Sequence, residues 1–516
     1  MTDAPLFAAS EPIFPRRVRG RFRTLKWAIM GLTLGIYYVT PWLRWDRGPN
    51  LPDQAVLVDL ANRRFYFFWI EIWPHEFYFV AGLLIMAGLG LFLFTSALGR
   101  LWCGYACPQT VWTDLFLIVE RWVEGDRNAR IRLWDAPWDA RKARLRLSKW
   151  AIWLLIAVAT GGAWVFYFAD APALARDLFT LRAAPVAYAT VAILTATTFV
   201  LGGFLREQVC IYMCPWPRIQ GAMMDPGTLT VGYRDWRGEP RGRGGVRRRE
   251  AAAASAGGGA AVARHGAGAS KDQAAPRLAR DGATLGDCID CRACVAVCPM
   301  GIDIREGSQM ECITCALCID ACDEVMARIG RPRGLVDYLA LDDRPPVEPG
   351  RTADVAPHAG PWRPRPVWRH VLRPRTILYT LAWAGIGVAL LVALFVRPEI
   401  DMTVAPVRNP TFVTLSDGTI RNAYDVRLRN KHGEARPFRL SLSAPDPLRI
   451  ELEGRDGLVV PVPPDSTRRQ RVYVAARPQD AAARAERTEV RLWVEDLVSD
   501  ERAHADTVFH GREGAP

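Results

Sequence analysis

Long runs of apolar residues without formal charges recur through the first 400 residues of this 516-residue chain. A helix needs about 20 apolar residues to cross the hydrocarbon core of a membrane. The runs therefore predict five membrane-spanning helices, of which the first is short, at Trp27–Leu43, Phe77–Leu98, Trp150–Ala169, Val186–Leu205 and Thr376–Val396. The alternative is that they are buried helices of a soluble protein, which are usually shorter.

After the last run, residues 403–510 alternate apolar and polar side chains. Stretches such as YDVRLRN, FRLSLS, LRIEL, RVYVAA and EVRLWVE are separated by Gly, Pro, Asp and Asn. A period of two is typical of β-strands, and short strands at this spacing predict an antiparallel β-sandwich of about 100 residues.

Two polar stretches separate these parts. The first is rich in Gly, Ala and Arg, and we expect it to be disordered because it buries too little apolar surface to order itself. The patterns divide the chain into an N-terminal arm (1–26), a four-span membrane domain (27–237), a disordered linker (238–282), a cysteine-rich domain (283–343), a Pro/Arg-rich linker (344–375), a fifth span (376–396) and a β domain (397–516).

The formal net charge of +12 comes from an excess of arginine. In a membrane protein such an excess marks cytoplasmic loops, so we expect no nucleic-acid partner. Basic residues crowd the N-terminal arm and the 99–149 loop, which predicts a cytoplasmic location for both and for residues 206–375. Five spans then place the β domain outside the cytoplasm. The loop from Arg44 to Glu76 opposes this orientation, because it carries four arginines yet is assigned outside.

All twelve cysteines fall into four clusters. Two of them follow the C-x2-C-x2-C-x3-C spacing of bacterial ferredoxins, in which three thiolates of one run and the last of the other bind each [4Fe–4S] cluster. This assigns Cys288, Cys291, Cys294 and Cys322 to one cluster, and Cys312, Cys315, Cys318 and Cys298 to the other. A zinc site needs only four ligands, so eight thiols favour iron–sulfur. Asp323 stands where ferredoxins usually have Pro, which removes no ligand.

The remaining cysteines form two C-x-Tyr-x-C-P motifs, Cys103/Cys107 and Cys210/Cys214, each after the second span of a two-span unit. This is the pattern of a tandem repeat. An i,i+4 pair places both sulfurs on one helical face, and we expect the following Pro to end the helix. If the units pack side by side, four thiolates converge. Soft ligands suit Cu(I), zinc or an iron–sulfur cluster, with Met213 as a further thioether. Buried structural cysteines and a redox-active disulfide are the alternatives.

The chain resembles the FixG/CcoG/RdxA family of cytochrome c oxidase accessory proteins. The resemblance rests on WCGYACPQTVW, on the VCIYMCP segment, on both ferredoxin runs and on NPTFVTLSDGTIRNAYDVRLRNK. It implies a bacterial inner-membrane polyferredoxin with a periplasmic immunoglobulin-like domain. It further implies reduction of Cu(II) to Cu(I) for assembly of the cbb3-type oxidase. Cys103, Cys107, Cys210 and Cys214 are then the catalytic copper site. The implied partners are copper ions, oxidase assembly factors or a copper transporter or chaperone, and an electron donor that the sequence does not identify.

Two other functions stay open at this stage. The chain resembles membrane electron-transfer subunits that relay electrons from quinol to a periplasmic reductase. It is also compatible with a non-catalytic scaffold for oxidase assembly, in which the clusters are structural. Fold alone does not separate these functions, because one fold carries many activities.

Overall fold

The computed structural model describes residues 12–48, 51–242, 277–278, 284–343, 367–397 and 400–512. The chain forms two compact units. The first contains all twelve cysteines and the long helices, apart from residues 389–396 at the end of the last one; the second contains those residues and the C-terminal β domain. Most of the expected linkers, residues 243–276, 279–283 and 344–366, lie outside the described residues.

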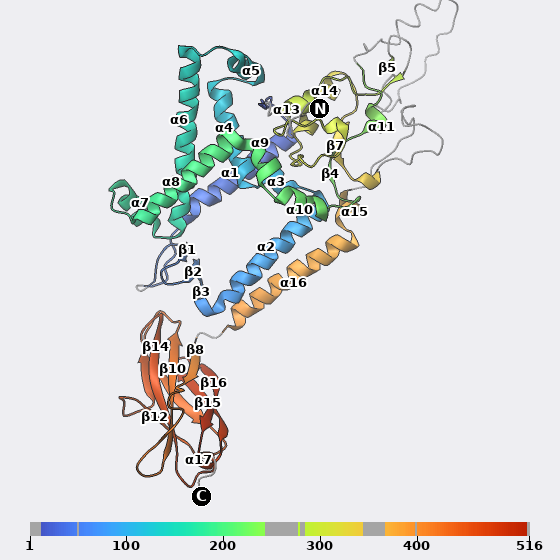
Figure 1. Cartoon of the computed structure of the whole chain (residues 1–516). Helices are drawn as coiled ribbons and strands as arrows, with labels where there is room; N and C mark the ends of the chain where they lie inside the picture. Colours follow the sequence, from blue (N-terminus) through green and yellow to red (C-terminus); the bar gives the residue numbers. More distant parts are fainter. Residues whose placement is uncertain are drawn as a thin grey trace, which may run out of the picture. The chain divides into compact units, whose positions relative to one another are not determined.

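Four helical runs in the described part of the chain are long and apolar enough to cross a membrane. They are α2 (Phe77–Leu98), the run Ala140–Tyr167 that begins with α6 (Ala140–Ala163), the run Pro185–Met213 that begins with α8 (Pro185–Val200), and α16 (Pro374–Val396) (Figure 1). They coincide with the four longer runs of the sequence. The prediction of a multi-pass α-helical membrane protein is therefore confirmed.

The first predicted span is a helix, α1 (Arg21–Val39), but it is not among those four. Its first turns carry Arg21, Arg23 and Lys26, which leaves a short apolar remainder. The tyrosines at its other end contact the late part of the α6 run: the hydroxyl of Tyr37 donates to the carbonyl oxygen of Thr160 at 2.6 Å. A fifth span stays a prediction.

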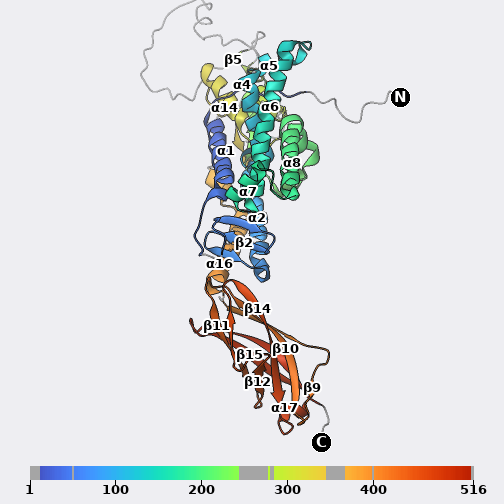
Figure 2. The ribbon, with the colours of Figure 1, turned by 90° about the vertical axis from the view of Figure 1, so that its left-hand side faces the viewer.

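The long helices of the first unit pack in pairs. The rings of Phe92 in α2 and Tyr379 in α16 lie 6.1 Å apart. Helices α6 and α8 lie side by side (Figure 2). Their backbones approach so closely that a Cβ on Gly161 would lie 2.7 Å from the carbonyl carbon of Leu194. Small residues permit such close approach of membrane helices. The shorter helices of this unit are α3 (Leu101–Tyr105), α4 (Pro108–Val123), α5 (Arg127–Asp135), α7 (Ala171–Phe179), α9 (Arg206–Gln208), α10 (Trp216–Met223), α11 (Asp235–Gly238) and α15 (Val367–Val371).

The cysteine-rich domain contains α13 (Ala293–Val297), α14 (Leu317–Arg328) and strand β7 (Val336–Leu339). Its sheet is completed by β4 (Thr230–Tyr233), which pairs antiparallel with β7 so that Thr230 faces Leu339. Strand β4 precedes the first linker in the sequence and lies outside the 283–343 range expected for this domain. The short strands β5 (Arg277–Leu278) and β6 (Thr284–Leu285) form a separate pair.

The N-terminal arm, the 99–149 segment and the cysteine-rich domain contact one another. The amide of Arg16 donates to the carbonyl oxygen of Ala296 at 2.8 Å, and the amide of Arg17 donates to Asp126 at 3.0 Å. The amide of Arg23 donates to Asp320 at 2.8 Å. These three segments therefore pack against one another, and their location on the cytoplasmic side stays a prediction from the basic residues of the arm and of the 99–149 segment.

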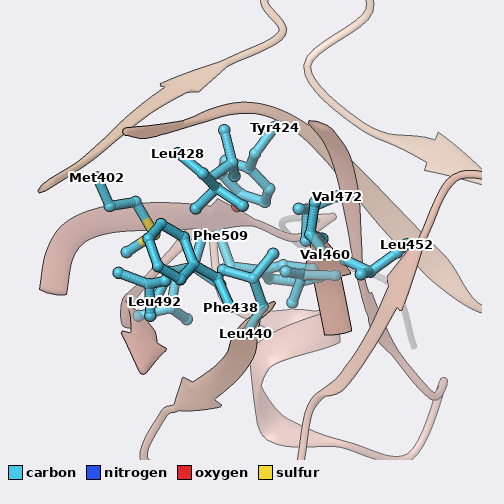
Figure 3. Close-up of a cluster of buried hydrophobic side chains, with 14 of the residues drawn as sticks. Met402, Tyr424, Leu428, Phe438, Leu440, Leu452, Val460, Val472, Leu492 and Phe509 are labelled. Atoms are coloured by element: carbon cyan, nitrogen blue, oxygen red, sulfur yellow. The ribbon is translucent and has the colours of Figure 1, made fainter. Parts of the chain in front are cut away.

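The second unit is a β-sandwich, as predicted. One sheet has the order β12-β14-β10-β8 with β9 paired to β10, and the other has the order β13-β11-β15-β16. Apolar side chains from both sheets fill the space between them, among them Tyr424, Phe438 and Phe509 (Figure 3). The strands are β8 (Ile400–Pro406), β9 (Val413–Thr414), β10 (Ile420–Asn430), β11 (Arg436–Ser443), β12 (Arg449–Leu452), β13 (Val459–Val462), β14 (Ser466–Ala476), β15 (Arg487–Asp496) and β16 (Arg502–His510), with the short helix α17 (Ala481–Arg484).

Residues 43–76 contain a three-stranded sheet in the order β1-β2-β3. Its strands are β1 (Val56–Asp59), β2 (Arg64–Phe67) and β3 (Ile70–Ile72).

Candidate metal centres

Eight of the cysteines line two neighbouring cavities in the cysteine-rich domain. One cavity, of about 330 Å³, is lined by Cys288, Cys291, Cys294 and Cys322. The other, of about 370 Å³, is lined by Cys298, Cys312, Cys315 and Cys318, with Cys294 at the shared wall. Each cavity thus combines three thiols of one run with the last thiol of the other, which is the division that the spacing assigns.

The backbone of both runs follows the same path around these cavities. In the first run Asp290 and Arg292 have φ angles of 53° and 55°; in the second, Thr314 and Ala316 have φ angles of 55° and 59°. Left-handed conformations are uncommon outside glycine and persist only where the surrounding structure demands them. In each run, residues in the left-handed conformation alternate with residues in ordinary conformations. This alternation turns successive backbone amides toward one concave space, which favours the binding of an anionic group.

This donor set fits a [4Fe–4S] cluster in each cavity. Four thiols surround a largely apolar space, and a cluster attaches each thiolate to a different iron atom. Burial raises the pKa of Cys294 and Cys312 to about 11 and that of Cys298 and Cys322 to about 12. These thiols are protonated at neutral pH without metal, so cluster binding must displace protons.

Cys103 and Cys210, one from each membrane motif, pack beside the second of these cavities. Cys103 is buried, whereas Cys107, Cys210 and Cys214 are half-buried. Cys103 belongs to an apolar cluster that also contains Cys315, with Cys210, Cys298 and Cys318 packed against it. Burial raises the pKa of Cys103, Arg100 opposes that rise, and Cys107 and Cys214 lie near enough to add to it. The two motifs are therefore brought together.

The helix before each proline ends there, as expected: α3 ends at Tyr105, and the helical turn Val209–Met213 ends before Cys214. Each proline also begins the next helix, since Pro108 opens α4 and Pro215 caps the start of α10. Cys107 and Cys214, the residues before them, are extended, with ψ angles of 128° and 123°. The prediction that each pair shares one helical turn is wrong for this reason: the residue before proline is driven away from helical geometry, while proline itself suits a first helical turn.

The first motif is in direct contact with the second ferredoxin run. The hydroxyl of Tyr105 donates to the carbonyl oxygen of Cys315 at 3.2 Å. A Cβ on Gly104 would lie 2.6 Å from the carbonyl oxygen of Ile313 and 3.1 Å from the amide nitrogen of Cys315. Only glycine allows this approach without a shift of the backbone. The guanidinium of Arg100 donates to the carbonyl oxygen of Met310, in the loop before the run.

The second motif is not equivalent to the first. Tyr212, the counterpart of the buried Tyr105, is 64% exposed, because the cysteine-rich domain covers the first motif and leaves Tyr212 uncovered. Met213 is 59% exposed and is not among the described residues that pack in the apolar cluster of Cys103, so the suggestion that its thioether joins the thiol site gains no support. The repeat visible in the sequence is conserved in local backbone geometry but not in environment.

The four membrane thiols do not form a ready-made site for one ion. Within the described ranges, no three His, Cys, Asp or Glu side chains converge on a point that holds a single metal ion. All twelve cysteines are free thiols, so neither motif forms a disulfide in this structure. A metal bound by these four thiols requires their rearrangement.

Several residues of the site could not be predicted from the spacing of the cysteines. The thiol of Cys103 donates to Oε1 of Gln220 at 3.0 Å, and Nε2 of Gln220 donates to Thr95 at 3.3 Å. Val231, from strand β4, lines the second cavity. The only local hint was the glycine inside CGY, which permits close approach of another backbone.

Comparisons with known proteins agree with this architecture. A family model for a 4Fe-4S dicluster domain matches residues 205–258 and 252–340, and a 4Fe-4S binding domain matches residues 79–124, which include Cys103 and Cys107. A model for the immunoglobulin-like fold at the C-terminal of FixG matches residues 390–512. A crystal structure of a FixG-related protein from Vibrio parahaemolyticus aligns with 22% of this chain and 99% of that chain, at 16% identity and a TM-score of 0.20.

Three curated relatives match almost end to end. Protein RdxB of Cereibacter sphaeroides is 63% identical over 98% of both chains. Protein RdxA of the same organism is 57% identical over 98% of this chain and 99% of its own. Nitrogen fixation protein FixG of Rhizobium meliloti is 52% identical over 96% of this chain and 92% of its own. The chain therefore belongs to the FixG/RdxA family, as a membrane iron–sulfur protein of the oxidoreductase class with an immunoglobulin-like C-terminal domain.

Proposed function

We propose that this protein reduces Cu(II) to Cu(I) and that the product serves the assembly of a cbb3-type cytochrome c oxidase. One observation carries the proposal: Cys103 and Cys210, one from each membrane motif, share an apolar cluster with Cys298, Cys315 and Cys318 of the second cavity. Thiols that suit Cu(I) thus lie beside a site for one-electron chemistry.

When bound, the iron–sulfur clusters supply single electrons. Cys103, Cys107, Cys210 and Cys214 act as the copper ligands, after their thiols lose protons. Cu(II) prefers nitrogen and oxygen ligands, whereas Cu(I) is well accommodated by sulfur. Transfer of one electron converts bound Cu(II) to Cu(I), and the sulfur-rich site favours that direction.

The charge around Cys210 supports reduction as well. A cavity of about 480 Å³, including its opening to solvent, borders Cys210 and the 297–300 segment of the cysteine-rich domain. Its ionisable lining residues are the cations Arg23, Lys26, Arg121 and Arg206 and the carboxylates Asp114 and Glu207. Positive charge therefore exceeds negative charge. Surroundings of this kind raise the energy of Cu(II) more than that of Cu(I), because the oxidised ion carries the larger charge.

The proposal includes an orientation in the bacterial inner membrane. The basic arm, the 99–149 segment and the cysteine-rich domain face the cytoplasm, on the positive-inside rule. If α1 spans the membrane, the β domain is periplasmic, where it is available to copper carriers or oxidase assembly factors. Fusion of a topology reporter to each end of the chain would test this orientation.

The decisive experiment is a single-turnover assay. Purified protein is reduced under anaerobic conditions, freed of excess reductant and mixed with Cu(II), and formation of Cu(I) is followed with a chromogenic chelator. We expect one Cu(I) for each electron lost by the protein. The double variant Cys103→Ser/Cys210→Ser should slow the reaction by about tenfold or more. Met213→Leu, which alters an exposed sulfur beside the motif, is the matched control.

Three results would overturn the proposal. Equal rates in wild type and in a variant with all four membrane cysteines replaced by serine would remove these thiols from the reaction. Oxidation of a quinol analogue, with no turnover of Cu(II), would favour the electron-relay function instead. A cluster-free variant that still supports oxidase assembly would favour a scaffold.

A further inference from the structure

A second cavity with a different chemistry lies where α6 enters its apolar stretch. We call it the α6 cavity; its volume is about 1050 Å³, including its open mouth. Lys142, Arg146 and Lys149 recur at helical spacing on the buried face of α6 and line it. Arg130 from α5 and Arg206 from α9 complete the cationic lining. None of the twelve cysteines contributes to it.

The buried charges of the α6 cavity do not balance. Glu120 and Glu124 are paired with four of these cations: Lys149 lies 3.4 Å and 2.9 Å from the two carboxylates, Arg146 lies 3.1 Å from Glu124, and Arg130 and Arg206 contact Glu120. With Lys142 and the carboxylate of Glu207, five cations face three anions. A buried excess of two positive charges is costly unless an anion compensates it.

One guanidinium group in the cavity has donor capacity to spare. The side chain of Arg130 is 1% exposed, and among the described residues its Nη1 has no hydrogen-bond partner. A buried N–H without an acceptor destabilises the folded state, because it has lost its hydrogen bond to water. The other cations also lie against aromatic faces: Lys149, paired with Glu124, lies over Trp153 at 4.7 Å, and Arg146, paired with the same carboxylate, lies over Trp134 at 5.7 Å. A further anion would therefore meet the excess positive charge of the cavity and the unpartnered Nη1 of Arg130.

The surroundings of the cavity suit an amphiphilic ligand. Trp134 and Trp138 line it and are 52% and 69% exposed, as expected of tryptophans at the level of lipid headgroups. Phe204 forms part of its lining and is 51% exposed, and the next turn of α6 exposes Leu154 and Leu155. An anion held by the cations would therefore have an apolar surface beside it.

We propose that the α6 cavity binds the phosphate group of an anionic phospholipid, with its acyl chains along the exposed apolar surface of α6 and Phe204. Basic pockets between membrane helices bind such headgroups in the same way. A neutral quinone would leave the excess charge uncompensated. A free phosphate would leave the exposed tryptophans and leucines without a role. The inference is independent of copper chemistry.

Binding to full-length protein with its clusters intact tests the proposal. The protein is placed in nanodiscs of phosphatidylcholine with increasing phosphatidylglycerol, and retained lipid is counted by native mass spectrometry after mild extraction. Arg146→Gln should weaken retention of phosphatidylglycerol about fivefold, the factor that corresponds to about 1 kcal/mol for one basic contact. Arg144→Gln, on the exposed side of the same helix, should leave it unchanged. Iron content checks that each variant is folded.

If Arg146→Gln does not fold, Lys142→Gln takes its place with the same expectation. The proposal is overturned if both α6 variants retain phosphatidylglycerol as the wild type does, or if phosphatidylcholine is retained equally well. It is also overturned if inorganic phosphate alone displaces the lipid at equal phosphate concentration, which would indicate a free-anion site. Displacement by a quinone analogue at similar concentration would indicate a quinone site instead.

Discussion

The hydroxyl of Tyr105 donates a 3.2 Å hydrogen bond to the carbonyl oxygen of Cys315. These residues are 210 positions apart, and the bond joins the first membrane motif to the second ferredoxin run. Tyr338 reinforces the same turn, since its hydroxyl donates to the carbonyl oxygen of Thr314 at 3.1 Å. The loop that carries Cys315 is thus held from the membrane side and from strand β7. This packing makes the thiols of Cys103 and Cys210 neighbours of the second cavity.

Gly104 is the tightest point of that contact. Gly104→Val places a side chain against the backbone of Ile313 and Cys315, so the second run must move. We expect iron content to fall from about eight atoms per chain toward four, because one of two four-iron clusters is lost. Iron and acid-labile sulfide analysis measures this. Gly88→Val, where no atom lies within 4 Å of a new Cβ, is the control. Full iron content in Gly104→Val would show that the contact is dispensable.

The crossed division of ligands predicts a pattern among serine variants. Cys288→Ser and Cys322→Ser alter the same cavity, whereas Cys298→Ser and Cys312→Ser alter the other. Electron paramagnetic resonance of the reduced protein should therefore show one altered signal for the first two variants and a different one for the second two. If Cys322→Ser matches Cys312→Ser instead, each run holds its own cluster and the crossed division is wrong.

We expect substitution of Glu120 to lower the stability of the protein strongly. It is 1% exposed and contacts Arg130, Lys149 and Arg206. Burial opposes its ionisation, but these cations hold the pKa of its carboxyl below the ordinary value. Glu120→Gln leaves buried cations without their counter-ion, which costs on the order of 3 kcal/mol.

Thermal unfolding in detergent measures this change. Glu324→Gln, which removes an exposed pair with Arg328, should change stability by less than about 1 kcal/mol. Equal effects of the two substitutions would contradict the role assigned to Glu120.

We expect the contribution of Asp225 to the stability of the protein to depend on pH. It accepts from Arg373 and, at 3.2 Å, from Arg375, at the start of α16. Burial opposes ionisation, yet these bonds hold its pKa below the ordinary 3.8. A lowered carboxyl pKa stabilises the folded state fully above pH 3.8 and loses that effect as pH falls through the folded-state value.

Asp225→Asn should therefore lower stability by about 1 kcal/mol at neutral pH, a modest value because the pair is partly exposed. The difference from wild type should persist down to about pH 4 and shrink below it. Unfolding midpoints across this range provide the measurement. A difference that grows on acidification would contradict the assignment.

Local patterns in the sequence determined most of the architecture. The four longer apolar runs became helices, four of the five alternating stretches lie within strands of the sandwich, and the fifth, LRIEL, begins one residue before β12. The ferredoxin spacing assigned Cys298 and Cys322 to opposite clusters, because that spacing encodes a known ligand geometry. Each of these features depends on residues close together in the chain, where periodicity and spacing constrain the backbone directly.

Tertiary structure alone decided the rest. Nothing in the order of residues indicates that β4 pairs with β7 across the linker, that Gln220 accepts from Cys103, or that Tyr105 is covered while Tyr212 is exposed. Likewise, the charges on α5, α6 and α9 are ordinary in sequence, and only their packing leaves positive charge in excess. The physical reason is the same in each case: burial, distance and net charge at a site depend on which distant segments pack against it, and the folded chain sets these quantities.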